Sequence, residues 1–213
     1  MKKLLLYTLL ITSVIACKKD DDGDTVDNTP RYEVIEIKTD FGNMYMWLYD
    51  NTPLHKANFL KLAKEGFFDG TTFHRIVPNF VIQGGDPNSK DSDPNNDGGG
   101  SPGYTITAEI DSSQYRHVLG AIGAARQGDQ VNPEKKSNGS QFYIVINNAG
   151  TAFLDGNYTV FGIIINGIEH AQTIVKQPRN ANDRPLTDVK MDVNVVSKTA
   201  AELKTEFNFE LPE

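Results

Sequence analysis

Cysteine is almost absent from this 213-residue sequence, which contains Cys17 and no other cysteine. A single cysteine excludes a framework of disulfides within the chain. A chain of this length buries about 70% of the surface of its unfolded state, so it can build a core without disulfides or metals. At roughly 150 residues per domain, and because all-β barrels of this size are often undivided, we expect one folded domain.

Positive charge is also scarce, since 21 lysines and arginines stand against 28 aspartates and glutamates, for a formal net charge of −7. A protein that binds DNA or RNA normally presents a basic face to the phosphates. We therefore expect no nucleic-acid partner. Hydrophobic residues at 38% and charged residues at 23% exclude disorder throughout the chain, collagen and coiled coil.

The N-terminus lacks an apolar stretch of transmembrane length. The uncharged residues 4–16 would span about 20 Å as a helix, whereas the hydrocarbon core of a bilayer is roughly 30 Å thick. Lys2 and Lys3 precede this stretch, and Val14-Ile15-Ala16-Cys17 ends it in a way that resembles the bacterial lipobox. We expect residues 1–16 to be a lipoprotein signal peptide and Cys17 to be lipidated. The alternative is a plain signal peptide followed by a free cysteine.

Residues 17–30 offer almost no apolar side chain to bury, and Lys18-Lys19-Asp20-Asp21-Asp22 opens them. This composition predicts a flexible acidic tether between the lipid and the domain. The Lys-Asp-Asp pattern also resembles signals that send some lipoproteins to the cell surface, although a solvated linker has the same composition. We expect the outer membrane of a Gram-negative-type bacterium, on its periplasmic face or at the cell surface, with membrane contact through the lipid anchor only.

From residue 31 onward the sequence consists of short β-rich runs separated by turn residues. One helix is predicted from Thr52-Pro53 to Gly66 and another over residues 168–176. Strands are predicted over residues 32–38, 43–48, 72–77, 81–83, 104–108, 141–146, 159–165 and 191–197. This pattern favours a closed antiparallel barrel whose ends are covered by the two helices. The barrel domain is expected over 31–197 and a C-terminal tail, with a short helix over 200–207, at 198–213.

Three patterns suggest chemistry that the neighbouring residues do not support. Residues 99–103 match a Gly-x-Ser-x-Gly nucleophile motif, but Pro102 lacks the backbone N–H that the oxyanion hole needs. Residues 93–98 match the start of a calcium-binding loop, but Tyr104 stands where a bidentate glutamate is required. Weak surface binding of calcium is the alternative to a solvated loop. The four histidines lack metal-ligand spacing, so no metal or cofactor is expected.

Two longer blocks are more specific: Phe73-His74-Arg75-Ile76-Val77-Pro78-Asn79-Phe80-Val81-Ile82-Gln83-Gly84-Gly85-Asp86, and Asn138-Gly139-Ser140-Gln141-Phe142-Tyr143-Ile144. Phe153-Leu154-Asp155-Gly156 and Val160-Phe161-Gly162 follow the second block. In order and spacing these blocks resemble the cyclophilin family of peptidyl-prolyl isomerases, from about Val34 to Val196. The resemblance implies a closed, eight-stranded antiparallel barrel capped by two helices.

The resemblance also implies roles for individual residues. Arg75 would be the catalytic arginine, Gln83 would help to orient it, and Phe80 would complete the catalytic set. The pocket for the proline ring would be formed by Phe80, Val81, Tyr143 and Leu154, the groove for the flanking peptide by Ala125, Arg126 and Gln141, and the far rim by Phe153 and Tyr158.

The sequence departs from well-known cyclophilins at several of these positions. Val81 stands where methionine is common, and Phe153 and Tyr158 replace a tryptophan and a histidine. Tyr143 stands where phenylalanine is common, so its hydroxyl needs a partner or water if it is buried. Residues 127–137 look longer than the corresponding family loop. These changes bear on peptide preference and leave Arg75 unchanged.

The residue types suit a reaction in which no bond is made or broken. An X–Pro amide rotates slowly, because twisting it sacrifices resonance, and the barrier is about 18–20 kcal/mol. A dry pocket that holds the ring, and an arginine that hydrogen-bonds to the twisted amide, would favour the transition state over both planar states. We expect a monomeric isomerase without a cofactor that acts on proline-containing polypeptides. The alternative is a weakly catalytic or non-catalytic cyclophilin-like module that binds peptides as a chaperone.

Overall fold

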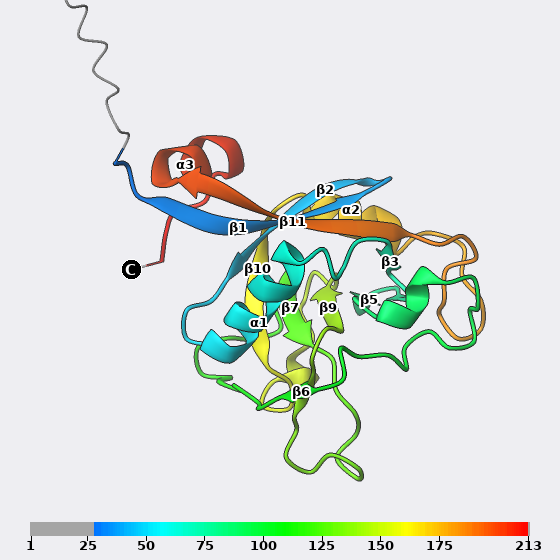
Figure 1. The fold of residues 1–213 in the computed structure, drawn as a ribbon. Coiled ribbons are helices and arrows are strands. Elements are labelled where there is room, and N and C mark those ends of the chain that lie inside the picture. Colours follow the sequence, from blue (N-terminus) through cyan, green and yellow to red (C-terminus); the bar gives the residue numbers. More distant parts are fainter. Residues whose placement is uncertain (1–27, 213) are drawn as a thin grey trace, which may run out of the picture.

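The computed structural model describes residues 28–212, shown as a ribbon in Figure 1. Cys17, the expected signal peptide and most of the expected tether lie outside the described residues. None of the helices within residues 28–212 is long and apolar enough to cross a membrane.

Most of the strands belong to one antiparallel sheet of nine strands, in the order β3-β11-β1-β2-β10-β7-β9-β5-β4. Their bounds are β1 (Arg31–Thr39), β2 (Gly42–Leu48), β3 (Thr71–Thr72), β4 (Arg75–Val77), β5 (Val81–Gly84), β7 (Ala121–Ala124), β9 (Phe142–Val145), β10 (Val160–Asn166) and β11 (Lys190–Thr199). A separate pair is formed by β6 (Thr105–Ile106) and β8 (Ser137–Asn138).

The sheet curls into a half-barrel, so the prediction of a closed, eight-stranded barrel is wrong. The two edge strands, β3 and β4, follow one another in the chain but do not pair. Phe73, between them, donates its backbone N–H to Val189 at 2.9 Å, and Ile76 of β4 donates to Asp183 at 2.8 Å. The carbonyl groups of the segment before β11 accept these N–H groups, so the edge strands are covered although the barrel is not closed.

Several strand predictions need correction at this level. The strand expected over 72–77 is divided between β3 and β4, and the strand expected over 104–108 is reduced to β6. The structure adds β7, which the sequence pattern did not indicate. Its residues, Ala-Ile-Gly-Ala, lack the β-branched and aromatic side chains that are typical of strands.

The two helices expected to cover the sheet are α1 (Pro53–Lys64) and α2 (Ile168–Ile174), and the helix expected in the tail is α3 (Ala200–Phe207). Leu62 of α1 and Ala171 of α2 are buried in the main core. Leu203 of α3 packs instead with Val34 and Trp47, on the opposite face of β1 and β2. Figure 1 shows α1 and α3 on opposite sides of β1 and β11. Short 3-10 turns form η1 (Pro87–Lys90) and η2 (Ala152–Leu154).

Alternation along the four strands β4, β5, β9 and β7 separates the main core from a second apolar cluster. Ile82 and Ile144 point into the main core, whereas Val81, Tyr143 and Val145 belong to the second cluster. Successive side chains of a strand lie on opposite faces, so the second cluster occupies the other face of these strands. That face carries the candidate site.

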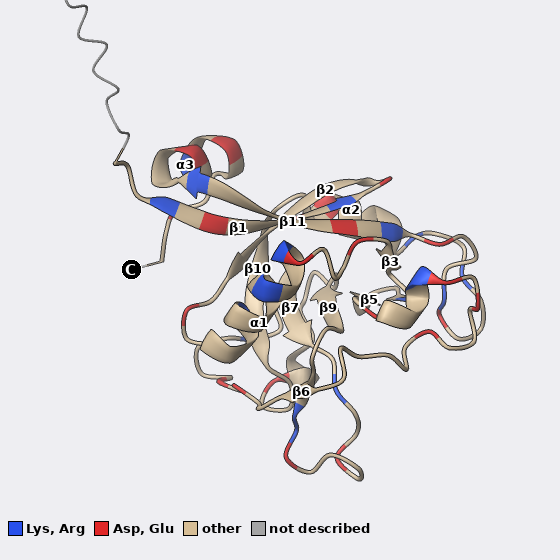
Figure 2. Cartoon of the chain, viewed as in Figure 1, with Lys and Arg blue, Asp and Glu red and all other residues tan. Residues whose placement is uncertain are grey.

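Charged residues of both signs are interspersed along the chain, including β1, β11 and α3 (Figure 2). The acidic loop before β6 satisfies its carboxylates locally, since Asp91 and Asp93 accept hydrogen bonds from the backbone N–H groups two residues further on. Within residues 28–212 no cluster of three or more histidine, cysteine or acidic side chains could hold a metal ion.

Candidate functional site

Strand register brings the main predicted site residues into one row. Arg75 of β4 is opposite Gln83 of β5, Gln83 is opposite Tyr143 of β9, and Tyr143 is opposite Gly123 of β7. Directly opposed residues of an antiparallel sheet point to the same face with Cβ atoms about 5 Å apart. Residues 75, 83 and 143, far apart in the sequence, therefore meet on the face that carries the second apolar cluster.

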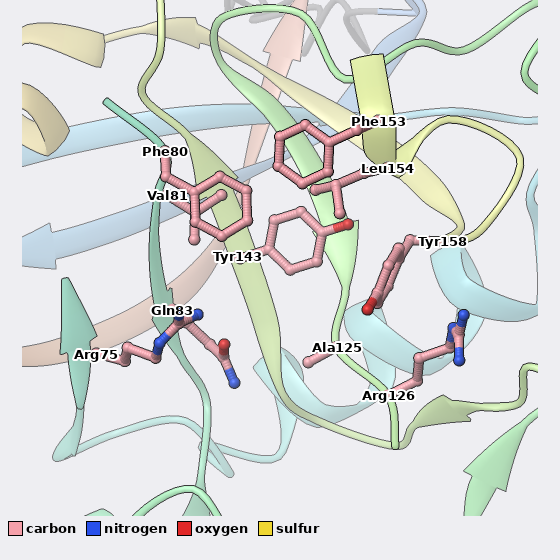
Figure 3. A pocket seen from close by; sticks show the side chains of 10 residues that line it. All are labelled: Arg75, Phe80, Val81, Gln83, Ala125, Arg126, Tyr143, Phe153, Leu154 and Tyr158. Carbon is pink, nitrogen blue, oxygen red and sulfur yellow. The ribbon is translucent and has the colours of Figure 1, made fainter. Parts of the chain in front are cut away.

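A pocket of about 390 Å³ lies over this row. Figure 3 shows its ten lining side chains, which are Arg75, Phe80, Val81, Gln83, Ala125, Arg126, Tyr143, Phe153, Leu154 and Tyr158. Every residue that the sequence assigned to the site is among them except Gln141. Tyr143 lies at the centre of this group, and the other residues surround it.

Seven of the ten lining residues are apolar or aromatic, and the other three are Arg75, Gln83 and Arg126. The Phe80 and Phe153 rings stack with centroids 5.5 Å apart, and Tyr158 meets Tyr143 edge to face at 6.0 Å. Val81 is buried, whereas Phe153 is 70% exposed and forms an open rim. Such a lining favours a compact apolar ring over water.

The guanidinium of Arg75 makes no hydrogen bond or ion pair with any residue that the structure describes. Its guanidinium lies 5.9 Å from the centre of the Phe80 ring, at the edge of the pocket. A guanidinium presents up to five N–H donors in a rigid plane, and here they are free for a bound molecule.

Arg126 is the other arginine of the pocket, and its guanidinium, unlike that of Arg75, is bound by neighbouring residues. It donates through Nε to the Asn157 carbonyl at 2.8 Å, pairs with Asp129 at 2.6 Å, and lies 4.5 Å from the centre of the Tyr158 ring. Its side chain is only 4% exposed. Arg126 therefore lines the groove as predicted but also fastens residues 127–137 to the loop that follows η2.

Gln141 does not line the 390 Å³ pocket but stands behind Gln83. Its Oε1 accepts a hydrogen bond from Gln83 Nε2 at 3.0 Å, and its Nε2 donates to the carbonyls of Gly98 and Gly100 at 3.0 and 2.8 Å. Gln141 also borders a neighbouring depression of about 410 Å³, which Val131 of the long loop lines as well. Gln141 thus couples Gln83 to the loop that precedes β6.

The hydroxyl of Tyr143 has the partner that the sequence required of it. It lies 2.8 Å from Nε2 of His117, and Nδ1 of His117 lies 2.7 Å from Oδ1 of Asp155. Burial raises the pKa of Tyr143 well above its usual value. Burial also lowers the pKa of His117, against the opposing effect of its bond to Asp155. No role was predicted for His117 or Asp155, and the only signal in the sequence was the need of a buried hydroxyl for a partner.

A second histidine array lies away from the pocket. His55 Nδ1 is 2.6 Å from Glu109, and its Nε2 is 2.9 Å from the Ser137 hydroxyl. The order of groups matches a hydrolase triad, but Ser137 is only 1% exposed, so a substrate cannot reach its hydroxyl. Glu109 also accepts from the backbone N–H groups of Leu54 and His55 and so caps α1. This array is structural.

The pocket offers an apolar cavity for a ring and one unpaired cationic donor at its edge. It holds no side chain placed as a nucleophile beside a base, because the hydroxyl of Tyr143 and its histidine are occupied with each other. A reaction that changes only the conformation of a bound amide fits these groups.

Comparisons with known proteins agree with this geometry. Residues 34–195 match the family model for cyclophilin type peptidyl-prolyl cis-trans isomerases. Peptidyl-prolyl cis-trans isomerase B of Bacillus subtilis is 43% identical over 118 residues, which cover 55% of this chain and 72% of the relative. The isomerase ppi1 of Schizosaccharomyces pombe is 34% identical over 163 residues, 74% of this chain and 94% of the relative.

Solved structures show the same fold. The crystal structure of a Cryptosporidium parvum cyclophilin type peptidyl-prolyl cis-trans isomerase matches with a TM-score of 0.68 and 27% identity, over 78% of this chain and 98% of that chain. A structure of the same protein in the presence of the dipeptide Ala-Pro matches with a TM-score of 0.67. Fold, pocket and sequence agree, and the chain belongs to the cyclophilin-type peptidyl-prolyl cis-trans isomerase family.

Proposed function

We propose that the pocket beside Arg75 is where this isomerase binds the proline ring of its polypeptide substrates, and that Arg75 is the group that lowers the barrier to rotation. The observation that carries this proposal is the free guanidinium of Arg75 at the edge of an aromatic pocket. Twisting the amide returns a lone pair to the proline nitrogen, and a fixed N–H donor stabilises that state more than either planar state. No cofactor is needed for this step.

Two further observations support the assignment. Gln83 lies opposite Arg75 in the β4–β5 hairpin, and its own amide is held by Gln141. The Cryptosporidium parvum relative was crystallised with a dipeptide that contains proline.

The direct test is a prolyl isomerisation assay with the purified protein, in parallel with peptide binding. We expect catalysis that depends on Arg75. If the protein binds proline peptides but accelerates their isomerisation no more than an Arg75→Ala variant does, the alternative function of a peptide-binding chaperone module is favoured instead.

We further propose that the protein is a lipoprotein of the bacterial outer membrane that assists folding outside the cytoplasm. Lys2 and Lys3, the uncharged stretch over residues 4–16 and the lipobox-like end at Cys17 support this proposal. The first strand of the described residues, β1, begins at Arg31, so residues 18–30 separate it from Cys17 in the sequence. The test is the mass of the processed N-terminus.

A further inference from the structure

We propose that His117 and Asp155 are positioning residues for the proline pocket: they tie the Tyr143 ring at its floor to the η2 turn in its wall, and thereby set the affinity for the proline ring. This inference rests on the proposed function of the pocket. It gives a task to the buried His117 and the partly buried Asp155, neither of which lines the space where a substrate would bind.

Tyr143, His117 and Asp155 form a chain of hydrogen bonds, here called the relay, in which donors and acceptors can be assigned. The Asp155 carboxylate accepts from the backbone N–H of His117 at 2.9 Å and lies 2.7 Å from its Nδ1. A carboxylate only accepts, so Nδ1 carries the proton and Nε2 of the neutral ring is an acceptor. The hydroxyl of Tyr143, at 2.8 Å, therefore donates to Nε2. Its proton points away from the pocket, which presents only the aromatic ring to the substrate.

The relay connects two separate parts of the pocket. Tyr143 belongs to β9, whereas Asp155 directly follows Phe153 and Leu154 of η2, which form the wall and rim. His117 is fixed to the same turn a second time, because its carbonyl accepts from the backbone N–H of Thr151 at 2.7 Å. Floor and wall are thus held together by one imidazole.

No side chain stands beside the Tyr143 ring at its cross-strand neighbour, which makes this link matter. Its cross-strand neighbour is Gly123, where even an added Cβ would lie 2.2 Å from the ring. The ring rests on bare backbone there, and the His117 ring lies nearly parallel to it, with centroids 5.9 Å apart. Loss of the hydrogen bond between the Tyr143 hydroxyl and His117 would therefore leave the ring free to tilt within the pocket.

The relay also predicts a pH dependence. Protonation of His117 places a donor on Nε2, so the Tyr143 hydroxyl accepts that hydrogen bond and its own proton has to turn toward the pocket. The remaining groups nearby are Asp155, Arg116 beside it, and Arg126 and Tyr158 facing Tyr143. Arginine and tyrosine do not ordinarily titrate between pH 5 and 8. Asp155 stays charged there, because hydrogen bonds from His117 outweigh burial and lower its pKa.

The test compares variants of the two buried histidines. His117→Leu should raise the Kd for an Ala-Pro peptide about tenfold, the cost of about one hydrogen bond, with a smaller change in kcat. His117→Gln can accept from the hydroxyl and donate to Asp155, and should restore most of the affinity. His55→Leu is the matched control, since His55 has the same kind of partners away from the pocket, and it should leave Kd unchanged.

Tyr143→Phe keeps the ring and removes the link, and it also serves if His117→Leu does not fold. It should raise Kd about as much as His117→Leu, and the double variant should bind no more weakly than either single variant, because residues that act as a unit are not additive. Wild-type affinity should fall as the pH drops below 6.5 through the lowered pKa of His117, and Tyr143→Phe should abolish this fall. The relay would be refuted if the effects of His117→Leu and Tyr143→Phe on Kd were additive, or if His55→Leu raised Kd as much as His117→Leu. Either result counts against the relay when the protein still isomerises proline peptides through Arg75. Absence of catalysis in the wild type would refute the proposed function instead.

Discussion

Gln83 donates its side-chain amide to Gln141 at 3.0 Å, although the residue opposite it in the hairpin is Arg75. Sequence resemblance assigned Gln83 to orienting the arginine. In the structure Gln83 is itself oriented by Gln141, which in turn is held by the carbonyls of Gly98 and Gly100. The loop before β6 is thereby connected to the edge of the pocket through two amide side chains.

Because Gln141 holds Gln83 at the edge of the pocket, substitution of Gln141 should change the activity of the enzyme. Gln141→Leu removes the acceptor for Gln83 and the donors to both glycine carbonyls, so we expect kcat/KM to fall about tenfold, the effect of roughly 1.4 kcal/mol. Gln141→Glu keeps the acceptor for Gln83 but turns a second carboxylate oxygen toward the Gly98 and Gly100 carbonyls and the Asp86 carboxylate, so it should lose at least as much activity. Thermal unfolding of both variants shows whether the fold is retained, and wild-type kinetics for Gln141→Leu would contradict the connection.

Stability should decrease on mild acidification. Burial is the main cause that lowers the pKa of His55, His74 and His117 below the usual 6.5. The unfolded chain therefore binds more protons than the folded chain between the lowered values and about 6.5. The stability that these neutral histidines provide is complete above that value and is lost progressively below it. Urea titrations between pH 7.5 and 5 should show a falling free energy of unfolding, and His55→Leu should reduce the slope. A free energy that is constant over this range would contradict the prediction.

The membrane anchor is tested by a single substitution. We expect Cys17 to carry diacylglycerol after processing and the expressed protein to partition with membranes. Cys17→Ala should release it or block its maturation, and Cys17→Ser, which also lacks the thiol, should behave in the same way. An unmodified cysteine, or cleavage at another position in the native protein, would show by mass spectrometry that the anchor is absent.

Much of the pocket could be predicted because its residues lie in short, distinctive blocks. The first block contains Arg75, Phe80 and Gln83 on one hairpin, so local pairing alone brings them together. The second block supplies Tyr143 from the neighbouring strand. The start of the first helix was also predictable, because Pro53 begins it at a position where its missing N–H costs nothing, whereas both helices end two residues before the predicted positions.

The remaining features depend on partners that are distant in the sequence. Strand β7 has no apolar alternation of its own, and its Gly123 is explained only by the Tyr143 ring that covers it. The barrel stays open because Val189 and Asp183 supply acceptors to the chain around β4. His117 and Tyr143 are 26 residues apart in the sequence, and no pattern near either residue indicates that their side chains meet.

Arg75 provides the most direct test of the account. The measurement is kcat/KM for isomerisation together with peptide Kd, for wild type, Arg75→Lys and Arg75→Ala. Loss of one charge-assisted hydrogen bond, about 1.5–3 kcal/mol, predicts a fall in kcat/KM of roughly 10- to 150-fold for Arg75→Ala, with a smaller change in Kd. Arg75→Lys should restore little, because an ammonium group lacks the planar fork. An Arg75→Ala variant that isomerises proline peptides as fast as the wild type would contradict the assignment.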